Sequence, residues 1–320
     1  MDSPGTDKTH LTFENVGLAF AFIVFDAAVS HLLSLGVGTS LVTAATRCIV
    51  QLSVMALVLA RIFETGNPWG VAGIAGLLNL MGTLETVINK AKMRFHYMFG
   101  FVLLSMVGST IPVSIIGTRF AIAVQPFWIA DQYVPIVGML CGSTISGMVI
   151  AVNYVLKELV ENKDKVEVYL AFGASRFEAC KPIARDALRL ALTPNVNQMS
   201  VLGIISIPGM MTGAILGGSS VQQAARLQMV IMFMISSCTA LSSMAITVSA
   251  LSVVVDGEHR VRGERVDRRQ HLVYRVRNRL AEVVKNGVEG ATEKIKGVFG
   301  KGKKGQEEEG TDGERQRLLG

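Results

Sequence analysis

The residues of this sequence that could do chemistry include polar side chains inside long apolar stretches. Asp26, Arg47, Gln51 and Glu85 are such residues. An ionisable group inside a membrane span is energetically costly, and it usually faces a cavity or another polar group. Asp26 and Glu85 lie near the ends of their stretches, so a place at the membrane surface is the alternative interpretation. None of the four supports catalysis, and we expect no enzymatic activity.

A second group lies in the apolar stretch SIPGMMTGAILGG, residues 206–218. A proline followed by a glycine interrupts a helix there, and the freed backbone groups are tolerated in a membrane only when they are buried in protein or line a wet cavity. Glycines at every fourth position favour close packing of helices, and two methionines offer thioethers to a soft metal. Two interpretations remain open, namely helix packing alone or a gate on a substrate path. The candidate path residues are Pro208, Gly209, Met210, Met211 and Gly213.

The spacing of the cysteines argues against a cofactor in this chain, and so does the departure of one segment from the phosphate-loop motif. The four cysteines are scattered and form no CxxC pair, so neither a disulfide framework nor a zinc site is supported and we expect no resident metal. The segment GVFGKGKK, residues 297–304, resembles a phosphate-binding loop, but Lys304 replaces the Ser or Thr that would hold magnesium. We therefore expect no ATP site in this chain.

The elements that must position these residues are membrane-spanning helices. The chain has 320 residues, of which 50% are hydrophobic and 18% charged, against roughly 25% charged in soluble domains. Stretches of about 18 to 25 residues with few charges are long enough to cross a bilayer. We expect an all-α polytopic membrane protein with about seven transmembrane helices and a transmembrane domain over 16–255. The predicted spans are 16–33, 40–62, 70–89, 97–118, 133–156, 196–217 and 225–255.

The distribution of Lys and Arg predicts how the chain is oriented. The loop after the third span carries Lys90, Lys92 and Arg94, and the long loop over 157–195 is also basic, whereas the opposite loops carry one Arg each. Because basic loops stay in the cytosol, we expect residues 1–15 outside the cytosol and the C-terminus within it. This role accounts for the formal net charge of +6. We expect the lipid bilayer, and no nucleic acid, as a partner.

The composition changes after residue 255. Residues 260–304 contain fourteen Lys or Arg and five Asp or Glu, whereas 305–320 contain two Arg and five acidic residues. We expect 256–320 to be a cytosolic tail that is basic, then acidic, and largely disordered; an amphipathic helix near 265–285 at the membrane surface is the alternative. Glu314, Leu318 and Leu319 resemble an acidic dileucine sorting signal. This pattern favours a vacuolar or endosomal membrane, with the plasma membrane as the alternative.

The long basic loop contains a charged helical segment, which lies between two apolar predicted spans. Glycine at position 173 fits a helix stop, and Ser175 with Glu178 forms the S-x-x-E pattern of a capping box that starts a second helix. Lys181, Arg185 and Arg189 fall on one face of that helix. The opposite face is apolar and consists of Phe177, Cys180, Ala184, Ala187 and Ala191. The segment is either an interfacial helix on lipid headgroups or a docking element for a cytosolic partner.

The spacing of three residues in this segment is similar to the EAA motif of ABC-transporter permeases. The motif has a Glu, a Gly six residues later and an Ile ten residues after that, which Glu167, Gly173 and Ile183 match. The sequence departs from the motif where Val168 and Tyr169 replace its alanines. It also has Arg185 and Asp186 in place of the closing Leu-Pro.

A longer block, residues 170–218, closely resembles the FetB and aluminium-sensitive-three permease family. The shared features are the Gly173-Ala174-Ser175 turn, the run from Arg185 to Pro194, and the segment from Ser206 to Gly213 with Ile207 in place of Leu. The resemblance covers roughly 40–255. It departs at Ser143 and Ser146, where bacterial members often have Asn, and in the long tail, which bacterial members lack.

The resemblance implies a function for the charged segment. It would be a coupling helix that sits in a groove of a separate ATP-binding subunit and transmits that subunit's movement to the spans. The residues that would couple to the ATPase are Glu167, Gly173, Ser175, Glu178, Lys181 and Arg185. The family further implies a homodimer of permease chains, ATP bound only by the partner, and export or sequestration of a metal or metal-linked solute. The alternative is an ATP-independent secondary transporter or channel, and a third possibility is a scaffold that transports nothing.

Overall fold

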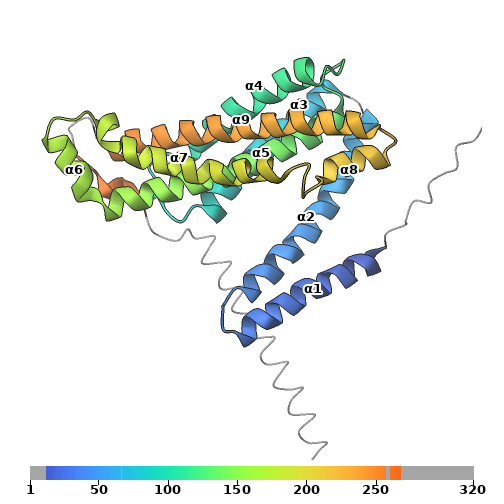
Figure 1. Cartoon of the computed structure of the whole chain (residues 1–320), viewed down its shortest axis with the longest axis horizontal. Coiled ribbons are helices and arrows are strands. Elements are labelled where there is room, and N and C mark those ends of the chain that lie inside the picture. Colours follow the sequence, from blue (N-terminus) through green and yellow to red (C-terminus); the bar gives the residue numbers. More distant parts are fainter. Residues whose placement is uncertain (1–11, 66, 257–259, 268–320) are drawn as a thin grey trace, which may run out of the picture. The chain divides into compact units, whose positions relative to one another are not determined.

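The computed structural model describes residues 12–65, 67–256 and 260–267 (Figure 1). The sorting-signal residues Glu314, Leu318 and Leu319 lie outside the described residues, as do nearly all of the predicted N-terminal segment and the tail beyond 267.

The described chain is built almost entirely from helices. Six of the described helices are long and apolar enough to cross a membrane, and the fold class is therefore the predicted all-α polytopic membrane protein. The six are α1 (Phe13–Leu32), α2 (Gly38–Thr65), α3 (Pro68–Leu84), α4 (Met98–Ile116), α5 (Ala130–Glu161) and α9 (Val221–Val254); the other α-helices are α6 (Lys163–Ala171), α7 (Arg176–Val201) and α8 (Gly209–Leu216). Short elements are η1 (Glu85–Lys90), η2 (Gly117–Ala121), η3 (Gly263–Arg265), β1 (Arg94–Phe95) and β2 (Val266–Asp267).

The chain divides into two compact units, of which the first comprises Met1–Ala72 and Trp128–Gln132. Within it, α1 and α2 form a helical hairpin. The backbones approach closely at Gly38, where a Cβ would lie 2.8 Å from the carbonyl oxygen of Ala27. The Ser30 hydroxyl accepts a hydrogen bond of 3.1 Å from the Val37 amide and thereby fixes the turn. The sides of both helices are exposed and apolar, as expected for a surface that faces lipid.

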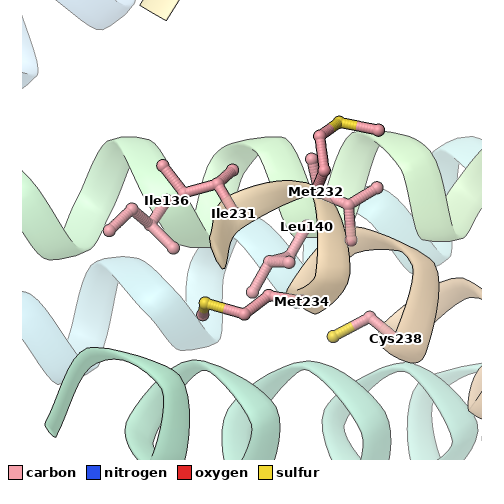
Figure 2. Close-up of a cluster of buried hydrophobic side chains, with 7 residues drawn as sticks. Ile136, Leu140, Ile231, Met232, Met234 and Cys238 are labelled. Atoms are coloured by element: carbon pink, nitrogen blue, oxygen red, sulfur yellow. The ribbon is translucent and has the colours of Figure 1, made fainter. Parts of the chain in front are cut away.

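The second unit, Gly73–Phe127 and Tyr133–Gly320, contains a bundle of long helices. Helices α7 and α9 run side by side, with α6 at one end of the bundle and α8 at the other (Figure 1). An apolar cluster joins α5 to α9 (Figure 2), and it consists of Ile136, Leu140, Ile231, Met232, Met234, Ile235 and Cys238. Two side-chain hydrogen bonds tie α4 to its neighbours: Thr110 donates to Asn79 Oδ1 at 2.7 Å, and the Ser114 and Tyr133 hydroxyls lie 2.9 Å apart. Bonds of this kind between membrane helices contribute about 0.6 kcal/mol each.

The predicted sixth span, 196–217, is not one continuous helix. Helix α7 ends at Val201 and α8 begins at Gly209, so residues 202–208 interrupt it. The interruption has a local cause, because Pro208 lacks an amide hydrogen and Gly203 has a φ of +84°. The chain instead returns along the bundle through α7. This helix is not among the six apolar ones because its exposed side carries Arg185 and Arg189, which the sequence analysis placed in a cytosolic loop.

Residues 260–267 form ordered structure, whereas the sequence analysis placed them in a disordered tail. The strand β2 pairs antiparallel with β1, with Phe95 opposite Val266, and Val255 bridges to Val261. Arg262 Nε lies 2.6 Å from Asp256 Oδ2, and Arg265 donates to the Val253 carbonyl at 2.9 Å. The segment after α9 therefore folds back onto the end of the bundle and ties it to the loop that follows α3.

Candidate coupling site

The junction between α6 and α7 has the local geometry that its sequence predicts. Gly173 has a φ of +89°, which a residue with a Cβ rarely adopts. Its amide donates to the Leu170 carbonyl at 3.0 Å, and the Ala174 amide donates to the Tyr169 carbonyl at 3.1 Å. These two bonds form a Schellman motif, which satisfies the last carbonyls of α6. Gly173 thus ends one helix and turns the chain toward the next.

The predicted capping box at the start of α7 is present. The Glu178 amide donates to Ser175 Oγ at 3.4 Å, and the Glu178 carboxylate accepts from the Ser175 amide at 2.9 Å and from its hydroxyl at 2.7 Å. These hydrogen bonds from Ser175 lower the pKa of Glu178, because they stabilise the charged carboxylate. The capping box therefore fixes the start of α7 at Ser175, directly after the turn at Gly173 and Ala174.

Aromatic side chains at this junction are exposed. Phe172 is 88% exposed, Tyr169 54% and Phe177 48%. Phe177 shares the apolar face of α7 with Cys180 and Ala187, but it is exposed whereas they are buried. The Arg176 guanidinium instead lies 5.0 Å from the centre of the Phe177 ring. The tip defined by Tyr169, Phe172 and Phe177, here the aromatic tip, presents apolar surface on an otherwise charged element.

Beyond the tip, α7 is amphipathic in the predicted sense. Cys180, Ala187 and Ala191 are buried, and burial raises the pKa of the Cys180 thiol to about 11. The basic residues lie on the exposed side, where α7 lines a groove of about 490 Å³. The groove residues are Glu178, Lys181, Pro182, Arg185, Asp186 and Arg189.

Glu167 lies beside a larger groove that the sequence did not predict. Its carboxylate pairs with Lys163 Nζ at 3.1 Å within α6. The groove has a volume of about 820 Å³, and its second wall is the segment 260–264 that folds back after α9. No local pattern could reveal this neighbour, since about ninety residues separate the two walls.

The candidate path residues lie at the opposite end of the bundle from α6, beside the start of α9 (Figure 1). Pro208 caps the short α8, and Met210 packs against the apolar cluster between α5 and α9. A Cβ at Gly209 or Gly213 would meet no atom within 4 Å. The close helix packing that these glycines predict therefore does not occur within the described part of the chain, and the break does not lie in the middle of the bundle.

The polar residues of the apolar stretches belong to both units of the chain. Asp26, Arg47 and Gln51 belong to the α1–α2 hairpin and are exposed. Glu85 is half-buried at the end of α3, where η1 begins, and accepts a hydrogen bond of 2.5 Å from Asn89 Nδ2. This position agrees with the alternative that Glu85 lies near the end of a span.

Comparison with known proteins identifies relatives that cover most of the chain. The UPF0014 membrane protein slr1647 of Synechocystis is 35% identical over 211 residues, which are 65% of this chain and 80% of that protein. The probable iron export permease protein FetB of Escherichia coli is 26% identical, over 73% of this chain and 88% of its own length. Protein ALUMINUM SENSITIVE 3 of Arabidopsis thaliana is also 26% identical, over 72% and 82%.

No solved structure matches the chain. The family described as "Uncharacterised protein family (UPF0014)" matches residues 13–254, which include every described α-helix and the junction between α6 and α7. The relative named as a permease agrees with a multi-pass membrane protein of the transporter class. The chain therefore belongs to the UPF0014 family.

Proposed function

We propose that this protein is the membrane-spanning permease subunit of an ABC-type transporter and that a separate ATP-binding subunit drives it. The observation that carries the proposal is the aromatic tip. Aromatic side chains that are exposed to water are less favourable than aromatic side chains that a partner covers. Aromatic residues also dominate the binding free energy of protein interfaces.

The way the tip is held supports a mechanical role. The Schellman motif at Gly173 and the capping box at Ser175 fix the tip to the end of α7. Helix α7 then continues for 26 residues, about 39 Å at 1.5 Å per residue, and its small residues pack along α9. A displacement of the tip by a bound ATPase would therefore move α7 against the bundle. Glu167, Lys181 and Arg185 line the two grooves beside the tip and would supply polar contacts at the rim.

The test is co-purification from native membranes with the aromatic tip altered. Phe172→Ala should lower the association with an ATP-binding subunit at least tenfold, because removing an interface anchor costs about 2 kcal/mol or more. Phe233→Ala is the matched control, since Phe233 is 66% exposed on α9, away from the tip. Equal association in both variants, or transport that persists without ATP, would favour a secondary transporter or channel.

For the cargo, we propose a metal ion or a metal-linked small solute. The support is the names of two relatives, one a probable iron export permease and one a protein of aluminium sensitivity. In the described residues no three His, Cys, Asp or Glu side chains gather as a metal site, which favours a cargo that keeps its own ligands. To check this proposal, ATP-dependent uptake into inverted membrane vesicles is measured once with iron and once with aluminium.

The assembly and orientation are also proposals. Two copies of the permease would pair with two ATP-binding subunits, with the α6 end of the bundle in the cytosol. The orientation rests on Lys90 and Arg94 of the α3–α4 loop, which β1 ties to the segment that lines the groove beside α6. For the location we propose a vacuolar or endosomal membrane, because the chain has the acidic dileucine pattern of a sorting signal. Replacing Leu318 and Leu319 by Ala should shift a tagged protein to the cell surface.

A further inference from the structure

Polar side chains are buried in the second unit where α5, α7 and α9 converge. The point of convergence is Gly147 on α5: a Cβ there would lie 3.0 Å from Ser243 Oγ on α9 and 3.7 Å from the Ala191 carbonyl oxygen on α7. It would also collide with the methyl group of Thr239. The three helices therefore approach one another at one level of the bundle.

Four buried polar atoms around this point have no hydrogen-bond partner. They are Thr144 Oγ1, Asn195 Nδ2, Ser243 Oγ and Thr247 Oγ1. Thr144 and Ser243 are fully buried, Thr247 is 1% exposed and Asn195 9%. Helix periodicity turns them toward the convergence, since Thr144 is three residues from Gly147, Asn195 four from Ala191, and Thr247 four from Ser243.

These hydroxyls differ from the others in the bundle. Buried Ser and Thr in apolar helices commonly donate to the carbonyl one turn earlier, and Thr83, Thr86 and Thr239 do so at 2.8 to 2.9 Å. Thr144, Ser243 and Thr247 leave that bond unmade. An unmade bond costs a buried polar group its full desolvation free energy. Four such groups within about a turn of the Gly147 level, Thr144 and Asn195 on one side of it and Thr247 on the other, indicate a ligand along this seam.

We propose that this convergence is a water-filled binding site on the transport route, lined by Thr144, Asn195, Ser243 and Thr247. The inference rests on the proposed function and extends it to the position that the cargo passes. Hydroxyl and amide groups carry no charge, so the site fits the hydration shell or the hydroxyl groups of a solute better than a dehydrated transition metal, which takes imidazole, thiolate or carboxylate ligands. Helix α7 links the site to the aromatic tip, because Asn195 belongs to the helix that Ser175 caps at its start.

The test uses cysteines introduced into the full-length chain in native membrane vesicles, in a Cys48→Ala background. Thr144→Cys and Ser243→Cys should react with a small charged methanethiosulfonate from water, and the reaction should abolish transport. Val152→Cys on α5 and the native Cys238 on α9 are the controls, because both positions are fully buried and each lies five residues from Gly147 or Ser243, on another face of its helix. They should react at least tenfold more slowly.

Reaction rates for Thr144→Cys and Ser243→Cys equal to the controls would overturn the proposal, as would modification that leaves transport intact. Thr144→Val and Thr247→Val provide a second measurement. At a dry site they should raise thermal stability and spare transport, whereas at the proposed site they should lower transport at least tenfold and leave ATPase association unchanged. That association is the readout of the aromatic tip, so failure of this inference is distinguishable from failure of the proposed function.

Discussion

Gly147 on α5 faces Ser243 on α9 so closely that a Cβ at position 147 would lie 3.0 Å from the serine hydroxyl oxygen. The same Cβ would overlap the Thr239 methyl group. Thr239 and Ser243 lie one turn apart on α9, so a single glycine sets how near the two helices come. Without interhelical hydrophobic attraction in lipid, such close contacts supply much of the packing energy.

Gly147→Ala should destabilise the bundle by about 1–3 kcal/mol, because a rigid Thr side chain and its helix must move to admit the methyl group. Gly142→Ala, also on α5, is the matched control, since its Cβ would meet no atom within 4 Å. Thermal unfolding of both variants in detergent, followed by size-exclusion chromatography, measures the difference. Equal midpoints would show that the helices are not in contact at Gly147.

Gly173→Val should leave membrane insertion intact and abolish ATPase association. The space around the position is open, since a Cβ would meet no atom within 4 Å, and the penalty comes only from the φ of +89°, which a β-branched residue resists. Gly173→Asn should recover much of the association, because Asn tolerates the left-handed region. A Val variant that associates as well as the wild type would contradict the role of the turn.

Ser175→Ala should destabilise the first turn of α7 by about 1 kcal/mol, the usual loss for an N-cap. Hydrogen exchange of the amides at the start of α7 reports this loss directly. Thr193→Ala is the control, because the Thr193 hydroxyl bonds to the Arg189 carbonyl in the same helix, far from the cap. Exchange that is unchanged in Ser175→Ala would show that the capping box does not hold the turn.

The capping box should also make the start of α7 sensitive to acid. Hydrogen bonds from Ser175 lower the pKa of Glu178 below the ordinary value of 4.5 for a glutamate side chain. A carboxylate whose pKa is lower in the folded state contributes stability above its unfolded pKa and loses it as the pH falls through the folded pKa. The protection of the cap amides, measured against their intrinsic exchange rates at each pH, should therefore fall below about pH 4.5 in the wild type, and a Glu178→Gln variant should show no such step.

Cys48 should be the cysteine that labels in the native protein. It is exposed on α2, whereas Cys141, Cys180 and Cys238 are buried. A membrane-permeable maleimide should modify one thiol per chain at neutral pH, and Cys48→Ala should abolish that signal, as intact-protein mass measurement would show. For Cys180 the pKa of about 11 also keeps the thiol protonated. Two or more modified thiols in the folded chain would contradict the packing of the bundle.

Much of the local structure was determined by the sequence alone. Apolar length identifies membrane helices because the bilayer sets the number of residues needed to cross it. The glycine stop at Gly173 and the capping box at Ser175 and Glu178 were also predictable, since their interactions join residues only three to five positions apart. Pro208 likewise predicted the break before α8. It did not predict where in the bundle that break lies.

The tertiary structure decided what depends on distant neighbours. Phe177 is exposed although it shares a face of α7 with the buried Cys180 and Ala187. Residues 260–267 are ordered because β2 pairs with β1, which lies far away in the chain. Thr144, Asn195 and Ser243 have no shared pattern in the sequence; they meet because α5, α7 and α9 cross at Gly147. Periodicity gives the face on which a residue lies, but only packing determines what that face meets.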